Sequence, residues 1–322
     1  MVKRDFLTVD ALSVPELFKT LDLADELKAE RRCGPALRTD LAGLSIGLIF
    51  EKPSTRTRVS FEVAIHELGG HTVSLDVADL QLGRGERGET VEDTARVLSR
   101  YLHALVVRTF AQSRLETIAT VGTIPVINAL SDFMHPCQAL ADLQTIREYK
   151  GALSGLKLCY LGDGNNVAHA LLQAGAMSGM HVAVGSPPGY GPIPQVVESA
   201  AAMAVESGGS VMVTADPLAA ARDADVVYTD VWASMGQELE HEARALMFGS
   251  FQVGEHVLEV ARPDAIVMHC LPAHRDEEIT AEVIDGQQSV VWTQAENRLH
   301  TSKALLLFLL GPQDLSAGRD AG

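Results

Sequence analysis

Short apolar runs recur along the chain and alternate with segments that carry apolar residues at helical spacing. Residues 45–49, 104–108 and 157–161 are such runs, and each is followed by a helical segment. Alternation of this kind predicts a doubly wound parallel sheet, because the helices are the crossovers between parallel strands. The pattern starts again at residue 157, and 322 residues suffice for two domains with their own cores. We therefore predict an α/β protein with two doubly wound parallel-sheet domains and an active site in the crevice between them.

The order of these segments predicts where the domains divide. The first domain is expected at residues 1–149 and the second at 150–294. The last apolar helix could pack on either domain. The predicted strands are residues 45–49, 71–75, 104–108, 125–127, 157–161, 181–185, 210–213, 225–229 and 265–269. The predicted helices are residues 14–32, 59–68, 90–100, 112–120, 136–149, 166–179, 194–207, 237–249, 255–261 and 295–310.

Charge and cysteine usage narrow the class of protein. The formal net charge of -16 argues against binding to nucleic acid or to anionic membrane surfaces. An anionic ligand would be repelled at long range, so a phosphate site would need a local cluster of arginines. The four cysteines show no C-x-x-C or zinc spacing, which suits a reducing compartment. With no signal peptide behind Met1 and no apolar run longer than residues 304–310, a cytoplasmic protein is predicted.

A strand-to-helix turn at residues 50–58 is rich in hydroxyl and guanidinium groups. Pro53 ends the strand, and Ser54 is a suitable N-cap for the helix that follows. The first amides of a helix lack intrahelical acceptors and lie at the positive end of its dipole. With the neighbouring side chains they form a site for a phosphate or similar oxyanion. The alternative is an ordinary capped helix with solvated arginines. The side chains concerned are Ser54, Thr55, Arg56, Thr57 and Arg58.

Two further polar positions are expected at the same edge of the first sheet. Arg108 ends the strand at residues 104–108 and is predicted to point into the crevice, although a solvated arginine is the alternative. His135 and Gln138 begin the helix at 136–149 and share one face, since they are three residues apart. Together they could hold a carbonyl oxygen and an amide nitrogen. A histidine that merely precedes a helix-starting proline is the alternative.

Residues 161–168 follow a strand and superficially match a dinucleotide-binding fingerprint. The third glycine position is Val167, and the next strand ends in Gly185-Ser186 instead of an acidic residue for a ribose. We therefore disfavour a dinucleotide. The side-chain amides of Asn165 and Asn166 could instead meet the polar groups of an amino acid.

Two other strand ends carry reactive side chains. Asp230 can pair with an ammonium group, although a helix-capping aspartate is the alternative. Cys270 lies between His269 and a proline turn, which permits a nucleophilic cysteine or, with His269 and His274, a metal site. Neither interpretation has a supporting signature, and Cys270 could equally form a polar wall beside a reacting amine. Arg298 adds a guanidinium near the start of the last helix.

Taken in order, these motifs resemble the aspartate/ornithine carbamoyltransferase family over residues 5–310. Segments 54–58 and 135–138 are similar to the carbamoyl phosphate motifs of the whole family. Segments 230–236 and 269–272 are similar to those of its ornithine-using members. The resemblance implies transfer of the carbamoyl group of carbamoyl phosphate to the δ-amine of L-ornithine, which gives L-citrulline and phosphate. It implies no cofactor and no metal.

The resemblance also implies a role for each matching residue. Thr57, Arg108 and His135 would polarise the carbonyl oxygen, and Gln138 would contact the carbamoyl nitrogen. The residues implied to bind carbamoyl phosphate are Ser54, Thr55, Arg56, Thr57, Gln81, Arg108, His135, Gln138, Cys270, Leu271 and Arg298. Those implied to bind ornithine are Asn166, Asp230, Ser234 and Met235. The implied catalytic set is Arg108, His135, Asp230 and Cys270.

The same resemblance implies an assembly and a chain path. Gln81 is similar to a residue that reaches into a neighbouring subunit's site, which implies a homotrimer and leaves open whether trimers assemble further. The C-terminal helix and tail, residues 295–322, would return to the first domain. Two departures stand out: residues 84–89 repeat Arg-Gly-Glu as if three residues were inserted, and Ala273 replaces an arginine found in some members.

Three rival functions are set against this prediction. A carbamoyltransferase for another amine, such as putrescine, differs only in its acceptor. A dinucleotide-linked dehydrogenase is disfavoured by Val167, and a non-catalytic two-domain binding protein usually carries an export signal. The sequence leaves open whether citrulline is made or broken down, because one site serves both directions.

Overall fold

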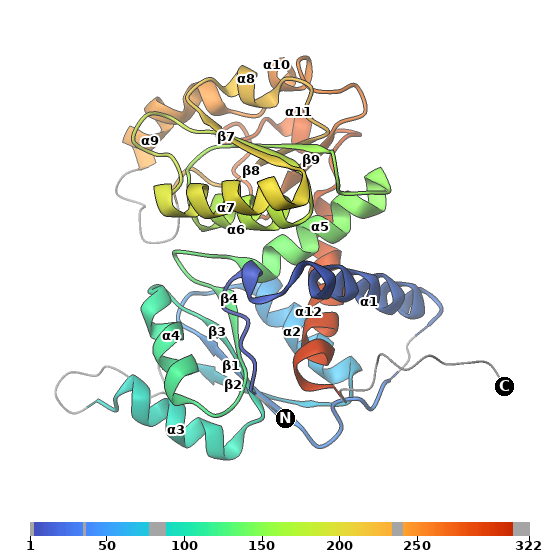
Figure 1. The fold of residues 1–322 in the computed structure, drawn as a ribbon, viewed down its shortest axis with the longest axis vertical. Coiled ribbons are helices and arrows are strands. Elements are labelled where there is room, and N and C mark those ends of the chain that lie inside the picture. Colours follow the sequence, from blue (N-terminus) through green and yellow to red (C-terminus); the bar gives the residue numbers. More distant parts are fainter. Residues whose placement is uncertain (1–2, 35–36, 77–87, 234–240, 312–322) are drawn as a thin grey trace. The chain divides into compact units, whose positions relative to one another are not determined.

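The computed structural model describes residues 3–34, 37–76, 88–233 and 241–311 (Figure 1). Contacts within the chain divide it into two compact units, called unit 1 and unit 2 below. Unit 1 comprises Met1–Leu7, Pro15–Ser131 and Arg298–Gly322, and unit 2 comprises Thr8–Val14 and Asp132–Asn297. In the described ranges, no helix combines the length and the apolar character that a bilayer crossing requires.

Unit 1 is built on a parallel sheet of four strands in the order β2-β1-β3-β4. Figure 1 shows α3 and α4 on one face of this sheet, and α2 with the C-terminal part of α12 on the other. The strands are β1 (Ser45–Phe50), β2 (His71–Asp76), β3 (Ala104–Arg108) and β4 (Val126–Leu130). The helices are α1 (Val14–Arg32), α2 (Thr55–Glu67), α3 (Val91–Tyr101), α4 (Gln112–Val121) and α12 (Val291–Leu310), of which α1 and α12 each begin in unit 2.

Two interactions hold the helices of unit 1 to its sheet and to each other. Buried side chains of β1 and β3, such as Ile49 and Val107, pack against Leu115 of α4. At the C-terminal end of α2, Glu67 forms an ion pair with Lys303 of α12 at 2.8 Å. Partial burial alone would raise the pKa of Glu67, but the contacts with Lys303 and Arg31 outweigh it and lower that pKa. The carboxylate therefore stays charged and ties α2 to α12.

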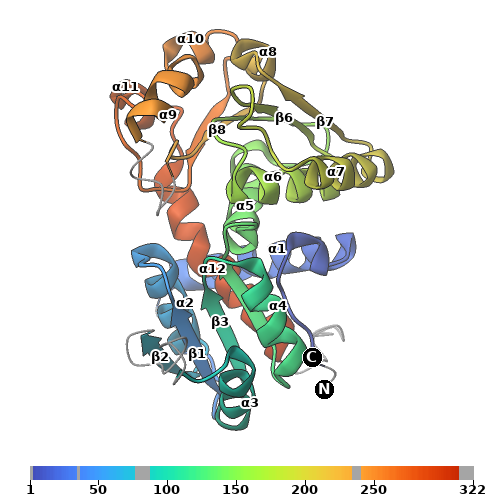
Figure 2. The same ribbon diagram turned by 90° about the vertical axis from the view of Figure 1, so that its left-hand side faces the viewer.

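Unit 2 contains a parallel sheet of five strands in the order β7-β6-β5-β8-β9. The helices α6 and α7 cover one face, and α8, α10 and α11 the other (Figures 1 and 2). The strands are β5 (Lys157–Leu161), β6 (His181–Gly185), β7 (Ser210–Thr214), β8 (Val226–Thr229) and β9 (Ile266–His269). The helices are α5 (Pro136–Lys150), α6 (Asn166–Met177), α7 (Pro194–Ser207), α8 (Pro217–Ala221), α9 (His241–Phe248), α10 (Glu255–Leu258) and α11 (Ala281–Ile284), with 3-10 turns at Val9–Ala11 and Gly249–Phe251.

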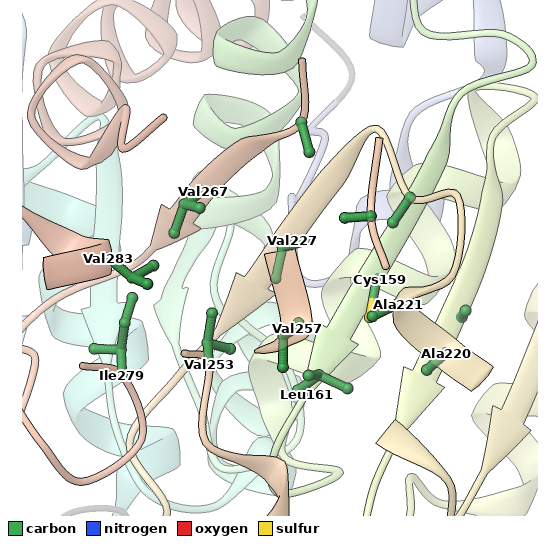
Figure 3. Close-up of a cluster of buried hydrophobic side chains, with 14 of the residues drawn as sticks. Cys159, Leu161, Ala220, Ala221, Val227, Val253, Val257, Val267, Ile279 and Val283 are labelled. Carbon is green, nitrogen blue, oxygen red and sulfur yellow. The ribbon is translucent and has the colours of Figure 1, made fainter. Parts of the chain in front are cut away.

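The core of unit 2 is built mainly from small and β-branched side chains. Figure 3 shows Val227 of β8 and Val267 of β9 pointing toward the side chains of Val257 and Val283 on the covering helices. Such residues suit a central parallel strand, which is buried on both faces. This core fixes the strand ends at which the polar motifs begin.

The predicted alternation of strands and helices is confirmed, with local differences. The α2 helix begins at Thr55, because Ser54 already caps it. The last helix begins at Val291, so Arg298 lies within it and not near its start. The short helices α8 and α11, of five and four residues, were not predicted, since so few residues show no periodicity. The predicted helix at 237–249 is described only from His241, where α9 begins.

Candidate functional site

The N-terminus of α2 in unit 1 is formed by the hydroxyl-rich turn. The Ser54 side chain accepts a hydrogen bond from the Thr57 amide at 3.3 Å, as predicted for an N-cap. Thr57 is buried, and its hydroxyl accepts a hydrogen bond from the Arg298 guanidinium at 3.1 Å. This bond holds the Arg298 guanidinium beside the first turn of α2. Its positive charge therefore lies where the helix dipole already favours an anion.

Arg108 lies at the carboxyl end of β3, opposite Phe50 at the end of β1. The turn that leads into α2 is tied to this strand end, because the Glu51 amide donates to the Arg108 carbonyl at 2.8 Å. The Glu51 carboxylate also accepts from Thr109 and forms an ion pair with Arg114. Arg108 is only 6% exposed, so its positive charge lies in the interior of unit 1. A guanidinium held in the interior at this strand end adds positive charge there, which suits an anion site.

His135 and Gln138 lie at the start of α5, as predicted, but this helix belongs to unit 2 and not to the unit that contains the first sheet. Pro136 occupies the first turn, and the Gln138 amide donates to the His135 carbonyl at 3.1 Å. Both side chains are buried. The Gln138 side-chain nitrogen donates to Asp142 at 2.8 Å. The first turn of α5 therefore holds both residues in fixed positions.

Three neighbouring strands of unit 2 end at the same level. Leu161 of β5 lies opposite Thr229 of β8, which lies opposite His269 of β9. The residues that follow these ends are therefore brought together, although they are far apart in the sequence. The Cys270 thiol donates to one oxygen of Asp230 at 3.0 Å.

Asn165 supplies the third member of this cluster. Its side-chain nitrogen donates to the other oxygen of Asp230 at 2.9 Å. Its side-chain oxygen caps α6 by accepting from the amides of Val167 and Ala168. Asn166, the next residue, lies in the first turn of α6 and is 9% exposed. Asp230 is thus held by two side chains and does not cap a helix.

The glycine-rich turn before α6 has a packing role. A Cβ atom on Gly164 would collide with the backbone of Gly191 and Pro192. The space into which the pyrophosphate of a dinucleotide would have to approach is therefore filled by the chain itself. This observation agrees with the absence of a third glycine at Val167 and disfavours the dehydrogenase alternative.

Both ring nitrogens of His269 have partners, which bears on the metal and nucleophile alternatives. The Leu271 amide donates to Nδ1 at 2.9 Å, so the proton lies on Nε2, which faces Glu278 at 3.1 Å. Asp230, His269 and Cys270 lie within reach of a single ion, but His269 would have to give up its contact with the Leu271 amide or with Glu278 to bind it. The thiol of Cys270 is hydrogen-bonded to Asp230 instead of to the imidazole. The site therefore favours the polar-wall interpretation of Cys270.

The remaining predicted positions lie beyond the strand end of β9 or outside the described residues. Leu271 comes shortly after His269, the last residue of β9. Arg275, the arginine two places after Ala273, forms an exposed ion pair with Asp285 at 2.8 Å. Gln81, Ser234, Met235 and the repeated Arg-Gly-Glu up to Arg87 lie outside the described residues.

Sequence reasoning did not identify one buried arginine. Arg244 of α9 is 6% exposed and donates to the Asp163 carboxylate at 2.8 Å and to the Trp232 carbonyl at 2.9 Å. It therefore connects the segment after β8 with the turn before α6. No local pattern marks it, because its two partners lie 81 and 12 residues away in the chain.

Comparison with protein families agrees with this arrangement. The carbamoyl-P binding domain of aspartate/ornithine carbamoyltransferase matches residues 4–148, and the Asp/Orn binding domain matches residues 154–309. The chain is 59% identical over 318 residues to an ornithine carbamoyltransferase of Parafrankia sp. (strain EAN1pec), covering 99% of both chains. It is 52% identical over 308 residues, 96% of both chains, to an anabolic ornithine carbamoyltransferase of Pyrococcus furiosus.

Solved structures give the same result for the fold. The ornithine carbamoyltransferase structure from Pyrococcus furiosus matches with a TM-score of 0.92 and 51% identity, covering 96% of this chain and 97% of that one. The structure from Gloeobacter violaceus matches with a TM-score of 0.86 and 47% identity, covering 96% and 99%. The predicted fold class and the predicted family are both confirmed. With both domain models matched along nearly its whole length, the chain belongs to the aspartate/ornithine carbamoyltransferase family.

Proposed function

We propose that this chain transfers the carbamoyl group of carbamoyl phosphate to the δ-amine of L-ornithine, giving L-citrulline and phosphate. The observation that carries the proposal is the match of both family domains together with 59% identity to an ornithine carbamoyltransferase over 99% of each chain. The relative from Pyrococcus furiosus is named anabolic, which supports the citrulline-forming direction and a place in arginine biosynthesis.

Unit 1 supplies the cationic part of the carbamoyl phosphate site in this proposal. The first turn of α2 holds the phosphate with its amides and with the side chains of Ser54, Thr55, Arg56 and Thr57. The buried guanidinium groups of Arg108 and Arg298 add positive charge, and the Thr57 hydroxyl orients Arg298. This local charge is required because the net charge of -16 repels an anion at long range.

Unit 2 supplies groups for the carbamoyl moiety and for ornithine. His135, with Arg108 and Thr57, polarises the carbonyl oxygen, and Gln138 contacts the carbamoyl nitrogen. Asp230 pairs with an ammonium group of ornithine, an assignment that its negative charge and its fixed position between Asn165 and Cys270 support. The remaining residues assigned to the substrates are Asn166, Ser234 and Met235 for ornithine, and Gln81, Cys270 and Leu271 for carbamoyl phosphate.

The reaction needs a neutral amine and a stabilised oxyanion. A free alkyl ammonium group has a pKa of about 10.4, so ornithine must lose a proton before it attacks. The amine nitrogen then bonds to the carbamoyl carbon, and the bond from that carbon to the phosphate oxygen breaks. Asp230 and Cys270 orient the amine and assist the loss of its first proton. The nitrogen releases a second proton as the new C–N bond forms, and the departing phosphate takes it up. Arginine and histidine donors stabilise the charge that develops on the carbonyl oxygen.

Assembly, compartment and domain limits complete the proposal. We infer a cytoplasmic homotrimer in which Gln81 serves a neighbouring subunit. The free cysteines and the lack of C-x-x-C spacing support a reducing compartment. Domains at 1–149 and 150–294, with 295–322 returning to the first, remain part of this proposal.

A citrulline assay with both substrates varied tests the function. Purified protein is expected to form citrulline and phosphate in equal amounts from carbamoyl phosphate and ornithine. Putrescine and aspartate, supplied as alternative amines, serve as the matched comparison. If putrescine were carbamoylated faster than ornithine, putrescine would be assigned as the substrate instead. No product from any amine, in protein that is folded by circular dichroism, would reject carbamoyl transfer altogether.

A further inference from the structure

A buried carboxylate in unit 2 lies behind the proposed carbamoyl-binding residue Gln138. Asp142, one turn further along α5, is fully buried. It accepts hydrogen bonds from Gln138 at 2.8 Å, from Gln294 at 2.7 Å and from the Tyr228 hydroxyl at 3.2 Å. Burial, with the nearby Asp142 charge, raises the pKa of Tyr228, so its hydroxyl keeps the proton that it donates.

This network fixes which end of the Gln138 amide faces Asp142. The backbone amide of His269 donates to the Gln294 side-chain oxygen at 2.9 Å, and a backbone N–H can only donate. The nitrogen of Gln294 must therefore face Asp142, whose Oδ1 acts as an acceptor. Gln138 approaches the same oxygen and consequently presents its own nitrogen to it. Its side-chain oxygen is turned away from Asp142.

We propose that Asp142 is a positioning residue that orients the Gln138 amide so that its Oε1 accepts a hydrogen bond from the NH2 group of the carbamoyl substrate. The proposal rests on the proposed function and deepens it, since it names the atom that selects a carbamoyl over an acyl phosphate. An NH2 group can donate to Oε1, whereas a methyl group of the same size has no hydrogen to donate to it.

Two stable phosphonates that differ only at this position test the idea. Phosphonoacetamide carries the NH2 group, and acetonylphosphonate carries a methyl group in its place. Their inhibition constants against carbamoyl phosphate are measured with the full-length wild-type enzyme. We expect a preference of about tenfold for the amide, the value of one hydrogen bond to a buried acceptor. Equal inhibition by the two compounds would overturn the proposal.

Variants assign the preference to Asp142. In Asp142→Ala the amide of Gln138 can turn over, and the preference is expected to fall to about twofold or less. Asp142→Asn is the conservative rescue, because its side-chain oxygen can accept from Gln138 in the same place. Tyr228→Phe is the matched control. It removes the hydroxyl contacts to the other carboxylate oxygen of Asp142 and to the Gln294 side-chain nitrogen, but it leaves the contact between Gln138 and Asp142 in place and should keep the preference. A folded Asp142→Ala enzyme that keeps the full preference would contradict the proposal.

A second measurement covers the case in which Asp142→Ala does not fold. A neutron structure of the wild-type enzyme with phosphonoacetamide locates the deuterium atoms on each amide. Nε2 of Gln138 facing Asp142, and Oε1 facing the inhibitor nitrogen, would support the proposal, while the reverse orientation would reject it. Failure of the proposed function is separate, because it would appear as a wild-type enzyme that forms no citrulline.

Discussion

The two units carry groups of opposite charge, placed by different means. In unit 1, the candidate phosphate site consists of one short stretch, residues 54–57, with two buried arginines added from elsewhere. In unit 2, a carboxylate, a thiol and an amide meet at Asp230, Cys270 and Asn165, after three different strands. In the proposed function, a helix N-terminus thus provides the anion site, and a set of strand ends provides the site for a cation.

This difference follows from what each substrate group requires. A phosphate needs several donors that converge, and the first turn of a helix supplies them from consecutive residues. An ammonium group needs an anion held in one orientation, which calls for side chains from several segments around it. Carbamoyl phosphate and ornithine differ in charge, so the two units should respond differently to substitution.

The largest effect is expected from removing a cation of unit 1. Arg56→Ala should lower kcat/KM for carbamoyl phosphate by at least about 10²–10³, the usual loss for one donor to a developing oxyanion. Steady-state kinetics with ornithine saturating gives the value. Arg96→Ala, which removes an exposed arginine of α3 paired with Asp93, is the control and should keep wild-type turnover. Wild-type turnover in Arg56→Ala itself would remove Arg56 from the site.

The matching change in unit 2 removes its anion. Asp230→Asn keeps the shape of the side chain but loses the charge, so the KM for ornithine should rise about 10- to 100-fold. Binding of phosphate, measured by calorimetry, should change by less than about twofold, because its proposed ligands are in unit 1. Asp285→Asn, at an exposed ion pair of the same unit, serves as the control. Equal losses for phosphate and ornithine would contradict the separation of the two sites.

A smaller effect is expected when the support of Asp230 is removed and the carboxylate is kept. Asn165→Ser can still cap α6, but its hydroxyl is too short to reach Asp230. The KM for ornithine should rise about three- to tenfold, the value of one hydrogen bond. Thermal unfolding should stay close to wild type because the cap is preserved, and Asn165→Ala, which loses the cap as well, gives the comparison. An unchanged KM in Asn165→Ser would show that Asp230 needs no such support.

The contrast between the units also explains what the sequence could predict. The α/β class and most elements followed from the alternation of apolar runs, which reflects parallel strands buried on both faces. The N-cap at Ser54 was predictable because capping is a local interaction, and its bond to the Thr57 amide confirms it. The family was recognised because its motifs stand at strand ends in a fixed order, while the roles of the single site residues stay predictions.

Interactions between distant segments were not predictable in the same way. Arg298 reaches Thr57 across 241 positions, and Gln294 reaches Asp142 across 152. Such pairs depend on how helices pack on the sheets, and no spacing in the sequence records them. Asn165 was noticed only as a residue that could meet a substrate, although its bond to Asp230 shows that it also orients another side chain.

The smallest effect concerns pH and a histidine that supports the His135 segment. In unit 2, Nδ1 of His169 donates to the Phe133 carbonyl at 2.8 Å, and Nε2 accepts from the Ile193 amide at 3.1 Å. Burial lowers the pKa of His169, against the opposing effect of the Phe133 carbonyl. The unfolded chain therefore takes up a proton at the ordinary value of 6.5, before the folded protein does. Below that pH, this histidine should reduce the free energy of unfolding by up to about 1.4 kcal/mol per pH unit.

Urea unfolding at several pH values measures this contribution. His169→Gln has no titrating group, so its free energy of unfolding should be lower than that of the wild type near pH 8 and should depend less on pH below about 6.5. His66→Gln, which removes an exposed imidazole from α2, is the matched control and should follow the wild-type slope. If His169→Gln and wild type lost stability in parallel as the pH fell, the histidine would take up its proton equally in both states. In that case His169 would be protonated in the folded protein. Its Nδ1 would still donate to the Phe133 carbonyl, but its Nε2 could no longer accept a hydrogen bond from the Ile193 amide.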